Sequence, residues 1–333
     1  MIITSSKATL KNGEAVDFTI VRAPDAEWAP RLMKLLGHKG EIWNWQNEQM
    51  LADPAGLDFH YYVLHRKGEG LSNVATGEFK GVGSFGHVYT TPEDRRKGAC
   101  AVIMERQMAH FLERGGRYLT LGTGFETTPY QIYKKFGFEG LEDQNGHMIY
   151  CRGSRDAFME EYFAPCRAVI EPIQWKHWPG ATVLFLSDAP GVIRMSPERV
   201  FGRVSTEGPL LKVLRDREAK FGGFMRGHAL VNPDTGAVLG VAVWGWDKLW
   251  TGTLILDVFC HPRFWDRAPE LLKALQLVPE DKRHVAYSDA QCPQKREVLE
   301  AVGFKAVTTL PQWQRINWAK EDRVDVTLLE RRV

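Results

Sequence analysis

The chain repeats one order of predicted elements, and this repeat limits the folds that it can adopt. In the first half, a predicted strand ends at Pro92, and an amphipathic helix, a strand and a short helix ending in a Gly-Phe pair (137–138) follow it. In the second half the same order runs from Pro262 to a Gly-Phe pair at 303–304. A repeat of this length indicates a duplicated domain rather than a solenoid.

We therefore expect an α/β fold of the mixed α+β kind, with two domains in tandem. The alternating segment "VDFTIVRA" and the apolar segment "TLILDVFC" are typical of strands, whereas "AVIMERQMAHFLE" has helical spacing. A length of 333 residues suits two domains. We place the first domain at 1–155, a connector at 156–164 and the second domain at 165–333.

Composition excludes several classes of partner. The formal net charge is +2, which is too close to neutral to favour a nucleic-acid or membrane partner. The five cysteines are scattered without a C-x-x-C pair, which speaks against a disulfide framework and a zinc site. No signal peptide or apolar run of membrane-spanning length is visible, so we expect a cytoplasmic protein without a metal. The oligomeric state stays open.

The stretch "PEDRRKGAC", from Pro92 to Cys100, joins a predicted strand to a predicted helix. Such a junction presents free backbone N–H groups and the positive end of the helix dipole, so it binds anions readily. Gly98 has no side chain and permits close approach of a ligand to the backbone. The physical alternative is a solvated cationic turn.

The surrounding segment, roughly residues 80–140, resembles the GNAT superfamily of acyl-CoA-dependent N-acetyltransferases. The pyrophosphate loop of that family, Arg/Gln-x-x-Gly-x-Gly/Ala, matches residues 95–100, and its Tyr-x-Lys-x-Gly-Phe signature matches residues 133–138. Two positions depart from the pattern. Cys100 replaces the last small residue of the loop, and Glu126 stands where the family often has Asn.

The resemblance implies two tandem GNAT-like domains, each a mostly antiparallel sheet with a central parallel strand pair flanked by helices. It implies acetyl-CoA as co-substrate and transfer of an acetyl group to a primary amine of a small molecule or peptide, by direct attack in a ternary complex. Backbone groups of Val88, Tyr89 and Thr90 would pair with the pantetheine arm. The pyrophosphate would be held by the loop, namely Arg95, Arg96, Lys97, Gly98, Ala99, Cys100 and Ala101.

The resemblance makes Tyr133 the candidate general acid for the departing thiolate; packing on an amphipathic helix is the structural alternative. The candidate bases are His87, whose ordinary pKa of about 6.5 suits proton removal, Glu126, or an ordered water. A buried structural role is the alternative for His87. Strand alternation places Phe85, His87 and Tyr89 on one face of their strand.

Residues of "EIWNWQNE" fall where the first helices of the family cover the acceptor pocket. Trp43 and Trp45 would wall that pocket, and Glu41 or Glu48 would attract a cationic amine; core packing is the alternative.

The second half keeps the order of elements but has no glycine loop, and a Phe-Trp pair (264–265) stands in its place. We therefore expect one acyl-CoA site, in the N-terminal half. A non-catalytic acyl-CoA-binding or protein-interaction module is the alternative function.

Overall fold

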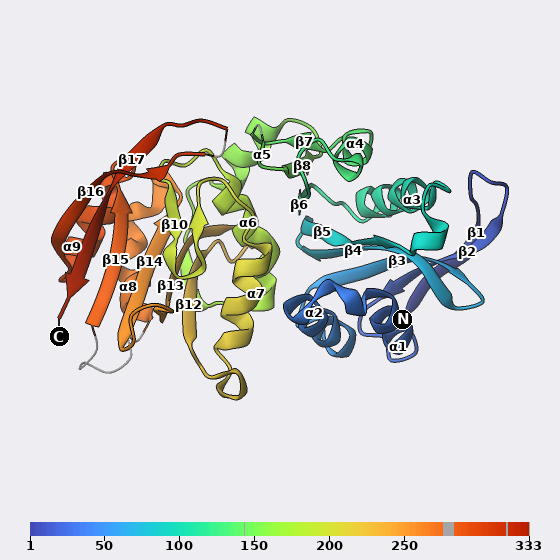
Figure 1. Ribbon diagram of the computed structural model, residues 1–333, viewed down its shortest axis with the longest axis horizontal. Coiled ribbons are helices and arrows are strands. Elements are labelled where there is room, and N and C mark those ends of the chain that lie inside the picture. The colour runs from blue at the N-terminus through green and yellow to red at the C-terminus, as the bar shows by residue number, and fades with distance from the viewer. Residues whose placement is uncertain (143, 276–282, 318, 333) are drawn as a thin grey trace. The chain divides into compact units, whose positions relative to one another are not determined.

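The computed structural model describes residues 1–142, 144–275, 283–317 and 319–332, which form two compact units. The first unit comprises residues 1–140 and 146–154, and the second comprises 141–145 and 155–333. Each unit contains a mixed sheet with helices on both faces (Figure 1). The predicted α/β class, with a mostly antiparallel sheet around one parallel pair, is confirmed.

The first sheet has the strand order β1-β2-β3-β4-β5-β6-β8-β7, and of its pairs β5–β6 is parallel. Its strands are β1 (Ile2–Thr9), β2 (Ala15–Arg22), β3 (Asp58–Arg66), β4 (Glu69–Phe79), β5 (Val82–Thr90), β6 (Tyr118–Gly122), β7 (Glu139–Gly140) and β8 (His147–Cys151).

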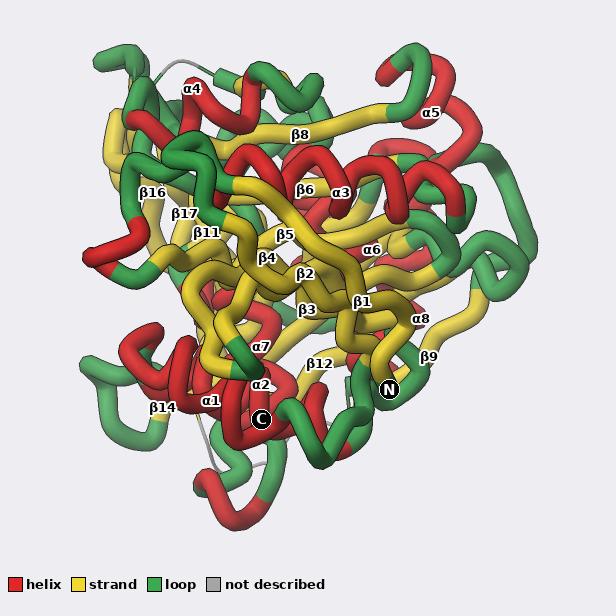
Figure 2. The backbone as a smooth tube through the Cα atoms, turned by 90° about the vertical axis from the view of Figure 1, so that its right-hand side faces the viewer, coloured by secondary structure: helices red, strands yellow, loops and turns green. Residues whose placement is uncertain are grey.

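The helices of the first unit lie on opposite faces of this sheet. One face carries α1 (Ala29–Leu36), the short 3-10 helix η1 (Gly37–Lys39) and α2 (Glu41–Ala52). The other carries α3 (Ala99–Glu113) and α4 (Thr128–Lys134) (Figure 2). The helix α3 forms because Ile103, Met104 and Phe111 make one apolar stripe that is buried on the sheet.

The second sheet has the order β16-β17-β15-β14-β13-β12-β9, with β14–β15 parallel. Its strands are β9 (Val169–Pro172), β12 (Met225–Val231), β13 (Val238–Trp246), β14 (Thr253–Cys260), β15 (Arg283–Asp289), β16 (Lys305–Arg315) and β17 (Arg323–Arg331). A separate hairpin consists of β10 (Ile193–Met195) and β11 (Val200–Phe201).

The second unit contains the helices α5 (Arg155–Tyr162), α6 (Trp178–Leu186), α7 (Glu207–Asp216), α8 (Ala268–Ala274) and α9 (Pro293–Ala301). Residues 156–164, assigned from the sequence to a connector, form most of α5 and the turn after it, within this unit. None of the described helices is both long and apolar enough to span a bilayer.

Candidate functional site

The two parallel strands at the centre of the first sheet separate soon after they begin. Their pairing is limited to Val82 with Tyr118, Gly83 with Leu119 and Ser84 with Thr120. Beyond Ser84 the strand β5 continues to Thr90, and among the described residues no strand pairs with it on this side. A gap therefore opens beside residues 85–90, between β5 and β6.

A β-bulge at His87 shapes the edge of this gap. The pairing of β5 with β4 shifts between Gly86 and Tyr89, and His87 adopts a positive φ of 51°. The bulge reverses the alternation of side chains. Phe85 packs against Tyr133 with ring centroids 5.4 Å apart, while His87 contacts Trp43 on the opposite face. The prediction that Phe85 shares a face with His87 is therefore wrong.

Two carbonyls of β5 point toward the gap, and each is bonded by a cation. The Thr91 N–H donates to Leu71 O on β4 at 2.9 Å, so the alternation of the backbone turns the carbonyls of Thr90 and Val88 away from β4. Lys39 Nζ donates to Val88 O at 2.8 Å. Arg95 Nε donates to Thr90 O at 3.2 Å.

The loop after β5 ends in free backbone donors. Gly98 caps α3 in the left-handed conformation, with φ 83° and ψ 7°, and no side chain caps the helix. Val102 N, bonded to Gly98 O at 3.2 Å, is the first N–H of the helix with a described acceptor. In the described part of the chain, the N–H groups of residues 96–101 have no acceptor. They therefore form a cradle of unpaired donors at the positive end of a 15-residue helix, an arrangement that favours anions.

The cationic side chains of the loop after β5 differ in whether they are paired with an acid. Lys97 Nζ donates to Asp94 Oδ1 at 2.8 Å, and Asp94 is also held by two nitrogens of Arg66. The Arg66 guanidinium holds the pKa of this buried carboxyl well below its usual range. Lys97 therefore fixes the shape of the loop, while Arg96, with φ 66°, is exposed.

A further cation reaches the loop from the turn between β1 and β2. The Lys11 N–H donates to Lys97 O at 2.9 Å, and the Lys11 side chain lies over Gly98. The φ of Gly98, 83°, favours glycine here, and a Cβ atom would also approach Lys11 Cγ to 2.8 Å, so that the flexible Lys11 side chain would have to shift. The sequence does not reveal Lys11, because it lies far from the loop along the chain.

Tyr133 lies on α4 beside the gap. Its ring is buried against Phe85 and Phe138, and burial raises the pKa of its phenol, with a smaller effect from Cys100. Tyr133 therefore keeps its proton at neutral pH. Burial raises the pKa of the half-buried Cys100 thiol to about 11. Ala99 is buried, and Ala101 is half-buried.

His87 is held as a neutral side chain by amides of α2. Its Nε2 lies 3.0 Å from Gln46 Oε1, and its Nδ1 lies 3.4 Å from Asn47 Nδ2. The Tyr61 hydroxyl donates to Asn47 Oδ1 at 2.9 Å, which fixes the Asn47 amide. Burial, and then the charge of Lys39, lower the pKa of His87 to about 3. The two buried amides were missed from the sequence, although polar residues inside "WNWQN" are a signal.

The other residues that the sequence predicts for the site lie at separate places in the first unit. Trp45 is buried, Trp43 is half-buried beside His87, and Glu41 is exposed. Glu126 is exposed in the loop after β6, where Gln131 Nε2 donates to it. Tyr89 lies on the α1 side of the sheet, with its ring centroid 4.0 Å from that of His38. Those two residues line a cavity of about 890 Å³ in the first unit.

The corresponding gap in the second unit is filled by the chain itself. The parallel pairing of β14 with β15 ends at Leu256 and Ala286, and the hairpin β10–β11 bonds across the gap that follows. The Ser196 N–H donates to Asp257 Oδ2 at 2.6 Å, on β14. The Ile193 N–H donates to Asp289 Oδ2 at 2.8 Å, at the end of β15.

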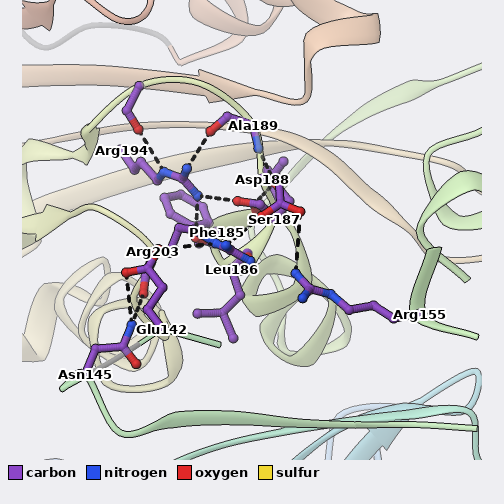
Figure 3. A network of polar contacts seen from close by, with 12 residues as sticks. Glu142, Asn145, Arg155, Phe185, Leu186, Ser187, Asp188, Ala189, Arg194 and Arg203 are labelled. Atoms are coloured by element: carbon purple, nitrogen blue, oxygen red, sulfur yellow. Dashed lines mark hydrogen bonds and ion pairs between the residues drawn. The ribbon is translucent and has the colours of Figure 1, made fainter. Parts of the chain in front are cut away.

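Buried charges anchor this hairpin. Lys295, on α9, donates to Ile193 O and to Asp257 Oδ1, the latter at 2.7 Å, and both charged side chains are almost fully buried. Arg194, on β10, donates to the carbonyls of Phe185, Ser187 and Ala189 at the end of α6 (Figure 3). Each charge is therefore satisfied inside the unit.

The segment that follows β14 differs from the cradle of the first unit. After β14 the chain forms a 3-10 helix, Pro262–Arg267, whose side chains Phe264 and Trp265 are buried. The helix that follows, α8, has seven residues. In the described parts of both units, no group of three or more His, Cys, Asp or Glu side chains is arranged to hold a metal ion.

No family model matches the chain, and no curated protein does. Similar solved structures include acetyltransferases. A GNAT-superfamily phosphinothricin acetyltransferase from Sinorhizobium meliloti with acetyl-CoA is 12% identical, with a TM-score of 0.38 over 49% of this chain and 87% of that one. A putative acetyltransferase from Salmonella typhimurium with acetyl-CoA is 16% identical, with a TM-score of 0.37 over 50% and 94%. One from Acinetobacter baylyi is 18% identical, with a TM-score of 0.38 over 50% and 93%. Sequence identities and TM-scores this low do not show the activity of this chain, which has to be argued from its own residues.

Proposed function

We propose that the first unit is an acetyl-CoA-dependent N-acetyltransferase that acetylates a primary amine of a small molecule or peptide by direct attack in a ternary complex. The observation that carries this proposal is the cradle of free N–H groups at residues 96–101, which lies at the end of β5 where the strand borders an open gap. Acetyl-CoA supplies the acetyl group as a thioester, and its pyrophosphate suits the cradle.

The residues around the gap divide the work. The amides of 96–101, with Lys11 and Arg96 beside them, hold the two phosphates. The carbonyls of Val88 and Thr90 accept amide N–H groups of the pantetheine arm, after Lys39 and Arg95 have turned away. Positioning the thioester next to the amine accounts for most of the rate enhancement.

Tyr133 acts as general acid. As the amine nitrogen forms its bond to the carbonyl carbon, the C–S bond breaks and the sulfur takes the phenol proton. The proton that the nitrogen loses on becoming an amide returns to the phenolate through water. The phenol is protonated at neutral pH, as a general acid must be, but burial raises its pKa and makes it a weaker acid, so the proton moves only as negative charge develops on the sulfur beside it. His87, with a pKa of about 3, is a weak base at neutral pH, so we propose that the ammonium of the acceptor loses its proton to water.

We further propose that the second unit, a degenerate copy at residues 165–333, does not bind acyl-CoA, because its own hairpin occupies the gap. The same structure is compatible with a non-catalytic acyl-CoA-binding module, since the cradle alone would hold a ligand. The two functions differ in whether an amine acceptor releases the thiol.

Calorimetry with acetyl-CoA, followed by a screen of amines for CoA release, tests both. We expect one acetyl-CoA per chain and amine-dependent release of thiol. Absence of binding would overturn the acyl-CoA site. Binding without release by any amine in a broad panel would favour the binding module.

A further inference from the structure

Resting on the acyl-CoA site proposed above, we propose that Arg66 is a positioning residue for that site. It holds the turn between β1 and β2 against the loop after β5, and in this way it sets the affinity for acyl-CoA without being part of the cradle itself. Arg66 is the last residue of β3. One wall of the cradle is the loop that ends at Gly98, and the other is the turn whose Lys11 side chain lies over Gly98.

The Arg66 guanidinium bonds one carboxylate from each wall. Its Nη1 and Nη2 donate to the two oxygens of Asp94, in the loop after β5, at 2.8 and 2.7 Å. Its Nε and Nη2 donate to the two oxygens of Glu14, in the turn between β1 and β2, at 2.6 and 3.0 Å. Paired bonds of this kind fix the direction of a carboxylate as well as its distance. The Glu14–Arg66–Asp94 bridge therefore fixes the turn and the loop relative to one another.

Asp94 transmits the effect of this bridge to the loop. Its side chain is only 2% exposed, and its carboxylate also accepts bonds from Lys97 Nζ at 2.8 Å and from Thr91 Oγ1 at 3.0 Å. Thr91 is the first residue after β5, and Lys97 directly precedes Gly98. The loop is thus tied, before and after its turn, to a carboxylate that Arg66 orients.

Glu14 transmits the effect of the bridge to the turn. The Leu10 N–H donates to Glu14 O at 2.9 Å, which closes the turn, and the Lys11 N–H donates across to Lys97 O at 2.9 Å. If the turn moved away from the loop, this bond and the cation over Gly98 would be lost together.

Without Arg66 the two carboxylates would repel each other. A single nitrogen, Arg66 Nη2, donates to Asp94 Oδ1 and to Glu14 Oε2, so the two carboxylates lie side by side. Like charges this close disfavour one another. Replacing Arg66 by an apolar residue should therefore separate the turn from the loop and leave an uncompensated acid beside the phosphates of the ligand.

Calorimetry with acetyl-CoA tests the proposal. Arg66→Met should raise the Kd by about 10-fold. Arg66→Lys should restore little of this loss, because one ammonium cannot make two paired bonds to two carboxylates. Arg22→Met is the matched control: Arg22 Nε bonds Asp58 Oδ1 at 2.9 Å at the other end of β3, and its loss should leave the Kd unchanged. An equal rise in both methionine variants, or full recovery by lysine, would overturn the positioning role.

The sign of the effect of Glu14→Gln separates positioning from charge. By charge alone, removing an acid near the site should tighten the binding of an anion. If Glu14 holds the turn through Arg66, Glu14→Gln should instead weaken binding by about 2- to 5-fold in the otherwise wild-type protein. In the Arg66→Met protein the same change removes a repulsion and should tighten binding. The same sign in both proteins would overturn the proposal.

A measurement without ligand separates this proposal from the proposed function. The Lys11 N–H, which bonds Lys97 O, should exchange its hydrogen with solvent about 10-fold faster in Arg66→Met than in the wild type. In Arg22→Met it should exchange at the wild-type rate. Equal rates in all three proteins would reject the bridge, even if no acetyl-CoA binds. Absence of acetyl-CoA binding by the wild type would count against the proposed function alone.

Discussion

The gaps between the central parallel strands of the two units differ in what fills them. In the first unit, two side chains, Lys39 and Arg95, bond the carbonyls at the edge of the gap. In the second unit, a backbone hairpin bonds both strands and is anchored by the buried pair of Lys295 and Asp257. A side chain leaves by rotating about its bonds, whereas the hairpin leaves only if the unit unfolds locally. The gap of the first unit is thus bordered by side chains that can rotate away, whereas the gap of the second unit is filled by backbone.

The largest effect on stability is expected from removing the buried ion pair that anchors the β10–β11 hairpin. Lys295→Met leaves Asp257 charged and buried without its partner, which should destabilise the second unit by about 3–5 kcal/mol. Chemical denaturation measures this loss. The double variant Lys295→Met/Asp257→Leu should recover much of it, and Arg296→Met, which changes an exposed neighbour, should cost little. A loss below about 1 kcal/mol would show that the pair does not hold the hairpin.

Filling the cradle of the first unit should abolish acetyl-CoA binding. Gly98→Trp places an indole among the free N–H groups and should weaken binding at least about 100-fold, because several charge-assisted hydrogen bonds are lost. Gly115→Trp is the matched control, since Gly115 at the other end of α3 has φ 81° and open space around it. Both variants carry the same backbone strain. Equal binding by the two variants would place the ligand elsewhere.

Removing the phenol of Tyr133 should affect turnover and not binding. Tyr133→Phe should lower kcat by about 100-fold, the usual contribution of a general acid, while the Kd of acetyl-CoA stays the same. Tyr130→Phe, a second buried tyrosine on α4, serves as control. A Tyr133→Phe protein with unchanged kcat would assign the tyrosine to packing alone.

The stability of the first unit should fall in mild acid because of His87. Its pKa is about 3 in the folded unit and about 6.5 in the unfolded chain, so between these values the unfolded state binds the additional proton. The loss attributable to His87 at pH 5, relative to pH 7, should be about 1–2 kcal/mol. Unfolding at both pH values measures it, and His87→Gln should show a smaller pH dependence. An equal dependence in the variant would mean that His87 is accessible to protons in the folded state.

The smallest effect is expected for the cation that the sequence did not reveal. Lys11→Ala should weaken acetyl-CoA binding by about 2- to 5-fold at low salt and by less at high salt, because an exposed charge is screened. Titrations at two ionic strengths measure the difference. A loss that does not respond to salt would point to packing of the Lys11 stem on Gly98 instead.

The features of this molecule that could be predicted are those formed by residues that are consecutive in the sequence. The turn of "PEDRRKGAC" into a helix, the glycine at its start and the strand before it are visible in consecutive residues. The bulge at His87 is not, because it depends on the register of β5 against β4. The pairing of Lys97 with Asp94 instead of a ligand depends on Arg66, which arrives from β3.

The same reason explains what was missed in the second unit. Its loss of the glycine loop is visible in "HPRFWDRAP", but the hairpin that seals the gap is not. Residues 192–201 carry no motif, and their role arises only when Asp257, Asp289 and Lys295 meet them in space.

The buried aromatic pair Phe264 and Trp265 has a consequence for how the two loops tolerate change over time. A loop that holds a ligand is constrained at the backbone, so Gly98 should accept no other residue without loss of function. A loop that only covers a core is constrained by volume, so positions 264 and 265 should exchange among large apolar residues. Related chains should therefore keep glycine at position 98 and show any of the large apolar residues at positions 264 and 265.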